Sequence, residues 1–182
     1  MVVSEAGGER VRGVIVETEA YLGWDDPASH AYRGRRHAGN AGIYSPPGHW
    51  YVYRSYGIHW CANLVVGPPG LGAAVLLRSV RITEGEAVAG QRRGGPDRRT
   101  LSNGPGKLCQ ALGIDRSLDG QRMRGSLVSI VPGAPTGGIQ VTPRIGITKA
   151  VDWPLRFLEW PACTRRHEAL PWRHLTRIEV RR

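Results

Sequence analysis

The feature that most constrains the fold is an apolar run that leads directly into two carboxylates, within Val14-Ile-Val-Glu-Thr-Glu-Ala-Tyr21. The β-branched residues predict a strand, and the unbroken run 14–16 predicts that this strand is buried on both faces. Side chains alternate along a strand, so we expect Glu17 and Glu19 to share one face. A buried carboxylate needs a partner. The stretch alone leaves two interpretations open, a catalytic carboxylate or two solvated or salt-bridged glutamates beyond the strand end.

The charge of the chain indicates the class of partner. With 182 residues and 41% hydrophobic residues, the sequence predicts one domain with a substantial core. The formal net charge of +10 and pI near 10.4 predict a polyanionic partner, most simply nucleic acid. The alternative is that the charge serves solubility. The sequence has no apolar run long enough to span a bilayer and no basic-then-apolar leader, so we expect an intracellular protein with no membrane partner.

The cysteines favour a reducing compartment and argue against a metal site. Cys61, Cys109 and Cys163 are far apart in the sequence, and an odd, scattered set is typical of buried thiols. The sequence has no CxxC or HxxxH pair, so we predict no zinc site and no other metal.

The 25 glycines and 13 prolines predict many turns and a strand-rich fold. We expect strands over residues 1–3, 11–21, 50–56, 57–66, 73–79, 127–131, 139–148 and 154–157, the first two forming a hairpin. A capping box at Thr83 and Glu86 predicts a helix to residue 93, and a second helix is expected over 103–113. Residues 24–48 are expected to form a long functional loop. We assign 1–160 to the domain and 161–182 to a basic, poorly ordered tail.

Two features each allow a functional and a structural interpretation. Tyr56 falls at the turn between two predicted strands, where it either forms an exposed tip or folds back onto the core. Lys107 follows Pro105 at the start of the second helix. Free amides there could bind a DNA phosphate, but an ordinary capped core helix has the same pattern.

A series of short segments then runs in order from residue 11 to residue 157. It comprises Val16-Glu-Thr-Glu-Ala-Tyr-Leu-Gly23, Asp26-Pro-Ala-Ser-His30, Pro47-Gly48, Tyr51-Val-Tyr53, Tyr56-Gly57, Asn63, Leu76-Leu-Arg78, Asn103-Gly-Pro-Gly-Lys-Leu-Cys-Gln-Ala-Leu112, Pro143-Arg-Ile-Gly-Ile147 and Pro154-Leu-Arg-Phe157. This series resembles the alkyladenine (3-methyladenine) DNA glycosylase family, the type found in mammals and many bacteria. The resemblance implies a mixed α/β (α+β) single domain with a curved antiparallel sheet, flanking helices and a protruding β-hairpin that inserts into DNA.

The resemblance implies catalytic roles for three residues. Glu19 would be the general base that activates water, while Arg78 and the main-chain carbonyl of Ile145 would help to hold that water. A carboxylate below the sugar can also stabilise the oxocarbenium-like state of N-glycosidic hydrolysis. No lysine stands beside Glu19 to form a Schiff base, so we expect a monofunctional enzyme with no cofactor.

The resemblance also implies how the base is recognised. Tyr21 and Tyr53 would stack on the flipped purine, and His30 would hydrogen-bond it. Asn63 would crowd the position of the exocyclic amino group of guanine. Tyr56 would fill the vacated stack through the minor groove.

The function implied is excision of alkylated or deaminated purines (3-methyladenine, 7-methylguanine and hypoxanthine) from duplex DNA, leaving an abasic site. The protein is expected to act as a monomer, in the bacterial cytoplasm at the nucleoid or in a eukaryotic nucleus. One alternative is a non-catalytic damaged-DNA-binding module on the same fold, and another is an RNA-acting protein. Duplex RNA presents a wide, shallow minor groove, which suits a wedge poorly.

Two segments depart from the family pattern. Family members usually carry a helix and a strand before the position of Val11, and here we expect that helix to be missing. Residues 158–166 also lack the aromatic and glycine-containing turn that usually follows. Neither departure touches the expected site residues.

Overall fold

The long strand β2 (Val11–Tyr21) organises the sheet, because other strands pair along both of its edges. Strand β5 (Ala73–Glu84) pairs with one edge of β2 over nearly the whole length of β2. The other edge is shared, since β1 (Val2–Ser4) pairs near the beginning of β2 and β8 (Arg156–Pro161) pairs at residues 17–19. The computed structural model describes residues 1–95, 100–133 and 137–161. Within these ranges, β2 is the central strand that the sequence predicts.

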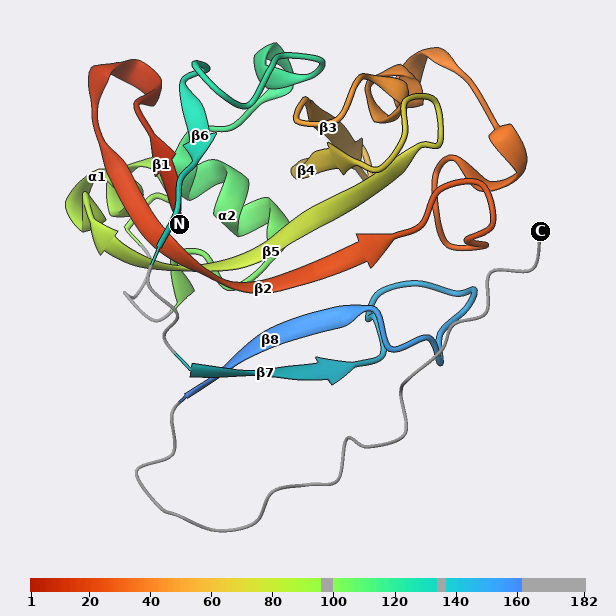
Figure 1. The fold of residues 1–182 in the computed structure, drawn as a ribbon. Helices are drawn as coiled ribbons and strands as arrows, with labels where there is room; N and C mark the ends of the chain where they lie inside the picture. Colours follow the sequence, from red (N-terminus) through yellow and green to blue (C-terminus); the bar gives the residue numbers. More distant parts are fainter. Residues whose placement is uncertain (96–99, 134–136, 162–182) are drawn as a thin grey trace, which may run out of the picture.

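The sheet is antiparallel and eight-stranded, in the order β3-β4-β5-β2-β1-β6, with β8 joined to β2 and β7 joined to β8 (Figure 1). The remaining strands are β3 (Trp50–Ser55), β4 (His59–Val66), β6 (Val128–Ile130) and β7 (Gly137–Thr142). The helices are α1 (Glu86–Arg92) and α2 (Pro105–Leu112), with short 3₁₀ turns at Ala6–Gly8, Tyr32–Gly34, Ala38–Tyr44 and Arg116–Leu118. This confirms the expected mixed α/β domain with a curved antiparallel sheet.

Two apolar clusters divide the interior. The larger one packs α1 and α2 against the sheet, and Leu108 and Leu112 of α2 are fully buried within it. The smaller cluster lies under the loop 24–48 and includes Ile43 and Tyr51. The long loop therefore covers its own part of the sheet, and the candidate site lies there, with the start of α2 at its border.

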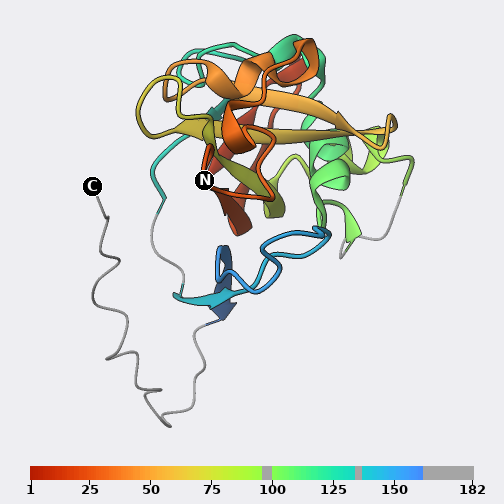
Figure 2. The same cartoon turned by 90° about the vertical axis from the view of Figure 1, so that its right-hand side faces the viewer.

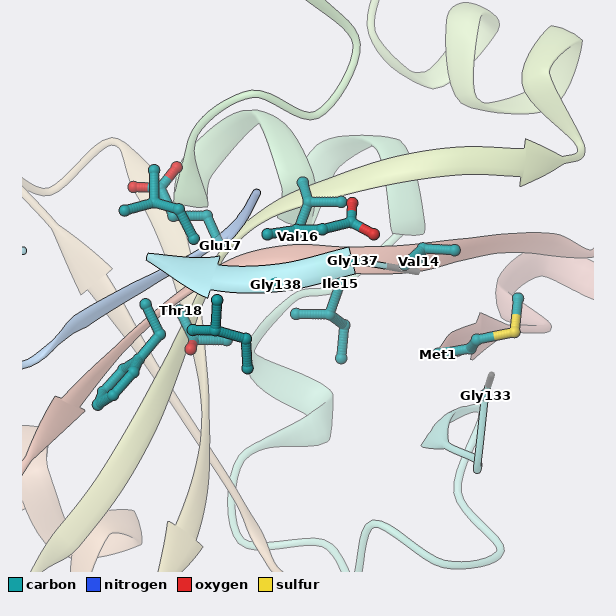
Figure 3. Close-up of a pocket in the computed structure, with 13 residues that line it drawn as sticks. Met1, Val14, Ile15, Val16, Glu17, Thr18, Gly133, Gly137 and Gly138 are labelled. Atoms are coloured by element: carbon teal, nitrogen blue, oxygen red, sulfur yellow. The ribbon is translucent and has the colours of Figure 1, made fainter. Parts of the chain in front are cut away.

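The expectation that residues 14–16 are buried on both faces is wrong. Val14, Ile15 and Val16 are each partly exposed, because β8 pairs with β2 only from residue 17 onward. A cavity of about 270 Å³ lies beside them, between β2, β7 and Met1 (Figure 3). The carboxylates also lie within the strand and not beyond its end.

Three predicted boundaries are wrong. The capping box is absent because β5 continues through Thr83 to pair with the start of β2, and α1 begins after Gly85. The strand predicted over 139–148 ends at Thr142, where Pro143 cannot continue the pairing. The final strand begins at Arg156 rather than residue 154. Long-range pairing with β2, which no local pattern encodes, set the end of β5, whereas Pro143 is a local signal that ends β7.

Other local predictions are confirmed. Strands β1 and β2 form the expected antiparallel pair, and α2 ends at Gly113, which has a positive φ of 64°. Cys61 and Cys109 are buried free thiols. Cys163 and the tail from residue 162 lie outside the described residues. None of the helices in the described ranges combines the length and apolarity needed to cross a membrane.

Candidate active site

Glu19 is fully buried and its carboxylate is held from three directions. Oε2 accepts hydrogen bonds from the Tyr21 hydroxyl at 2.9 Å and from Arg78 Nη1 at 3.1 Å. Oε1 accepts one from the main-chain N–H of Ile145 at 2.9 Å. A carboxylate offers about four lone-pair sites, so the described donors leave one free on Oε1. That oxygen can accept a proton from water or stabilise a nearby positive charge.

Glu17 joins the same network of ion pairs through Arg78. Arg78 Nε donates to Glu17 Oε1 at 2.9 Å, and Arg156 Nε donates to the same oxygen at 2.6 Å. One arginine thus contacts both glutamates, which places them on the same side of β2 as alternation predicts. The salt-bridged interpretation is correct for Glu17. For Glu19 the ion pair and a chemical role are compatible, because Arg78 occupies only one of its oxygens.

The residues that hold Glu19 also line a cavity. This cavity has a volume of about 470 Å³, and Tyr21, Arg78 and Ile145 form part of its wall. The lining also contains three further rings: Tyr51 and Tyr53 stack with ring centroids 5.4 Å apart, and the His30 ring meets Tyr53 edge-on with centroids 4.5 Å apart. A flat, electron-rich lining of this kind suits a planar or cationic ring.

The shifted pKa values of Tyr21, Tyr53 and His30 favour the neutral form of each ring in the cavity lining. Desolvation, followed by the charge and hydrogen bond of Glu19, raises the pKa of Tyr21, so its hydroxyl stays a donor. Desolvation likewise raises the pKa of Tyr53. Desolvation, and then His37 and Arg35, lower the pKa of His30. A neutral imidazole has one donor and one acceptor nitrogen, and Nδ1 of His30 lies 2.7 Å from the Tyr51 hydroxyl.

Asn63 is the buried amide of the cavity wall. It lies on β4 opposite Tyr51 and donates from Nδ2 to the Tyr51 carbonyl oxygen at 3.1 Å. The hydrogen bond fixes the orientation of the amide, so the group presents a fixed shape to the cavity.

Tyr56 occupies the turn between β3 and β4, and it does not fold back onto the core. It is 90% exposed, and it adopts a positive φ of 50° beside Gly57 at 68°. These angles and the hydrogen bond from Ile58 N–H to the Ser55 carbonyl oxygen are those of a tight hairpin turn. A tyrosine there costs roughly 1–2 kcal/mol relative to glycine. Figure 2 shows β3 and β4, orange to gold, running together to this turn.

Lys107 lies in the first turn of α2, whose Pro105 borders the cavity. Its side chain is exposed, and Nζ donates to Asn103 Oδ1 at 3.0 Å. A Cβ at Gly106 would lie 2.9 Å from the Cβ of His59, so glycine allows α2 to approach β4 closely. The start of α2 and the β3–β4 hairpin therefore lie side by side.

Sequence reasoning missed three residues of this site. Tyr51 shares a face with Tyr53, and its period-two spacing was the available signal. Asp26 and Arg144 form a buried ion pair behind Tyr21. Nothing local marks two residues so far apart as partners. The structure brings the predicted Glu19, Tyr21, His30, Tyr53, Asn63, Arg78 and Ile145 together, but Ile145 contacts Glu19 through its N–H, while the role of its carbonyl stays a prediction.

The described residues contain no group of three or more histidine, cysteine, aspartate or glutamate side chains arranged to hold a metal ion. The groups that the described site does present are a buried carboxylate and an aromatic cavity.

Comparisons with known proteins agree on one family. The family model described as methylpurine-DNA glycosylase (MPG) matches residues 1–160. A protein of Rhodopseudomonas palustris (strain HaA2), named "Putative 3-methyladenine DNA glycosylase", is 49% identical over 149 residues, covering 82% of this chain and 73% of the relative. Proteins with the same name in Nitrosospira multiformis (46% over 147 residues, 81% and 75%) and Methanoculleus marisnigri (48% over 150 residues, 80% and 77%) are similar. The family match includes every residue of the site described above.

Proposed function

This chain belongs to the methylpurine-DNA glycosylase family and is a monofunctional DNA glycosylase for alkylated bases, and we propose that it acts on purines flipped out of duplex DNA. We propose that it releases 7-methylguanine and hypoxanthine as well as 3-methyladenine. The observation that carries the proposal is Glu19, buried behind the wall of an aromatic cavity and held by residues of that wall.

The aromatic cavity is the proposed base pocket. Tyr21 and Tyr53 would stack on the extruded purine, and neutral His30 would hydrogen-bond its edge. Stacking on electron-rich rings favours cationic bases, which alkylation at a ring nitrogen creates. The volume of about 470 Å³ supports this assignment, because it exceeds that of a single purine and leaves space for water.

Glu19 is the proposed general base. Water at the free lone pair of Oε1 would lose a proton to Glu19 as it attacks the sugar carbon, and the purine would leave with the bonding electrons. The carboxylate would also stabilise the oxocarbenium-like state electrostatically. Arg78 and the Ile145 carbonyl would hold the water. Lys107 and Lys149 are the only lysines of the sequence, and both are exposed, which is consistent with water as the nucleophile.

The surroundings of the pocket supply the proposed DNA contacts. Tyr56, exposed at the hairpin turn, would occupy the space that the flipped base leaves. Lys107 at the start of α2 would contact a phosphate. A single lesion has no two-fold symmetry, so we propose a monomer, located wherever its DNA lies: at the nucleoid of a bacterium or in a eukaryotic nucleus.

The test is single-turnover base release from duplex DNA that carries one lesion, for the wild type and Glu19→Gln. Hypoxanthine and 7-methylguanine duplexes are compared with release of 3-methyladenine from methylated duplex DNA. We expect release by the wild type and a loss on the order of 10²–10⁴-fold in Glu19→Gln, with lesion binding retained.

Two results would contradict the proposal. Tight lesion binding without release by the wild type would favour the damage-binding module. Equal release by wild type and Glu19→Gln would move the general base elsewhere, with Glu17 tested next as Glu17→Gln.

A further inference from the structure

Asp26 and Arg144 form an ion pair that is completely enclosed. Both side chains have 0% exposure. Arg144 Nη1 donates to Asp26 Oδ2 at 2.5 Å and Nη2 donates to Oδ1 at 2.9 Å, a bidentate contact. The partners are 118 positions apart in the sequence. Enclosing two charges costs desolvation energy that an apolar pair would avoid, so a purely structural link of this kind gives little net stability.

Each partner also fixes main chain close to the cavity. Asp26 accepts hydrogen bonds from the main-chain N–H groups of Leu22 and Ala28. These bonds fix the turn that leads to His30. Arg144 Nη1 donates to the Ala20 carbonyl oxygen at 3.1 Å, at the end of β2. The pair therefore ties the end of β2, the following turn and the 143–147 segment into one unit.

Two contacts connect this unit to the reacting groups. The Arg144 guanidinium carbon lies 4.7 Å from the centroid of the Tyr21 ring, whose hydroxyl donates to Glu19. Ile145, the next residue in the chain, donates its N–H to the other oxygen of Glu19 at 2.9 Å. Of the three donors on Glu19, Tyr21 thus contacts the Arg144 guanidinium and Ile145 follows Arg144 in the chain.

We propose that Asp26 and Arg144 are positioning residues that orient the Glu19 carboxylate through Tyr21 and the Ile145 amide. The proposal rests on the proposed function of Glu19 and deepens it. Neither side chain is among the residues that line the cavity, and the pair acts by keeping one Oε1 lone pair directed at the attacking water. A fixed carboxylate needs no reorientation during the reaction.

Arg144→Lys is the primary variant because lysine keeps the positive charge but cannot form the bidentate fork or lie flat on the ring. Asp26→Asn is the second variant, and it keeps the shape but removes the charge. Arg81→Met is the control: Arg81 pairs with Glu159 on the partly exposed face of the sheet, away from the cavity. Each variant is made alone and combined with Glu19→Gln.

The experiment measures single-turnover release against enzyme concentration, on the lesion that the wild type releases fastest. The curve separates the maximal rate constant from the half-saturating enzyme concentration. Rates are normalised to the binding-competent fraction, obtained by titration with lesion duplex. We expect Arg144→Lys to lower the maximal rate constant on the order of 100-fold, with half-saturation nearly unchanged. In the Glu19→Gln background the same substitution should cost about twofold or less.

The double-mutant cycle distinguishes positioning from general loss of structure. Equal fold-losses in both backgrounds would overturn the proposal, because a structural defect does not depend on Glu19. An unchanged rate in either folded single variant would also overturn it, as would a comparable loss in Arg81→Met. If the wild type itself releases no base, the proposed function fails, and that result is separate from the cycle.

Discussion

At the scale of single residues, discrimination between purines is predicted to depend on Asn63. Its amide is buried, and its hydrogen bond to the Tyr51 carbonyl fixes its orientation in the cavity wall. We expect Asn63→Ala to raise release of undamaged guanine and to lower the ratio of lesion to guanine release by about 10–100-fold, since a removed clash weakens rejection. Competition between lesion duplex and undamaged duplex measures that ratio.

Cys61→Ala, two positions earlier on β4, is the matched control and should leave the ratio unchanged. If both variants lower it equally, the cavity size and not the Asn63 amide discriminates.

At the scale of an element, the β3–β4 hairpin presents one exposed ring at a strained turn. Backbone strain at an exposed aromatic suggests a function for the ring. We expect Tyr56→Ala to weaken binding to lesion duplex about 10–100-fold, the value of one stacked ring, and to weaken binding to undamaged duplex much less. Tyr56→Phe keeps the ring and should bind as the wild type does. Fluorescence anisotropy with both duplexes measures the difference, and an equal loss on both would exclude the wedge.

At the scale of the whole molecule, the buried Asp26–Arg144 pair predicts how the stability of the fold depends on pH. Burial by itself would raise the pKa of Asp26, but hydrogen bonds from Arg144, Ala28 and Leu22 hold it below its ordinary value. The folded state thus binds this proton less readily than the unfolded state. The stabilisation is complete above about pH 5 and is lost as the pH falls through the lowered pKa.

We therefore expect the difference in unfolding free energy between wild type and Asp26→Asn to shrink as the pH falls below about 4. At pH 7 the difference should be about 3–5 kcal/mol, because asparagine leaves the Arg144 charge unpaired. Urea unfolding at pH 7 and pH 3 measures both values. A difference that stays constant with pH would mean that Asp26 is not charged in the folded protein.

The local sequence was sufficient for most of the strand pattern and for the side of β2 on which its two glutamates lie. Alternation along β2 placed Glu17 and Glu19 on one side, where Arg78 contacts both. The turn signal at Tyr56-Gly57 correctly located the β3–β4 connection. Side-chain alternation and turn position depend on residues that are neighbours in the sequence, so both can be predicted from the sequence alone.

Only the tertiary structure decided which distant groups meet. The register of β2 with β5 extended β5 through the predicted capping box, and the late pairing of β8 left residues 14–16 partly exposed. Folding also selected the Ile145 N–H as a partner of Glu19 and joined Asp26 to Arg144. Buried charges and amides must find partners wherever packing brings them, and that choice depends on the whole domain. The sequence by itself therefore determined the types of residue at the site, and the fold determined how Glu19 is held.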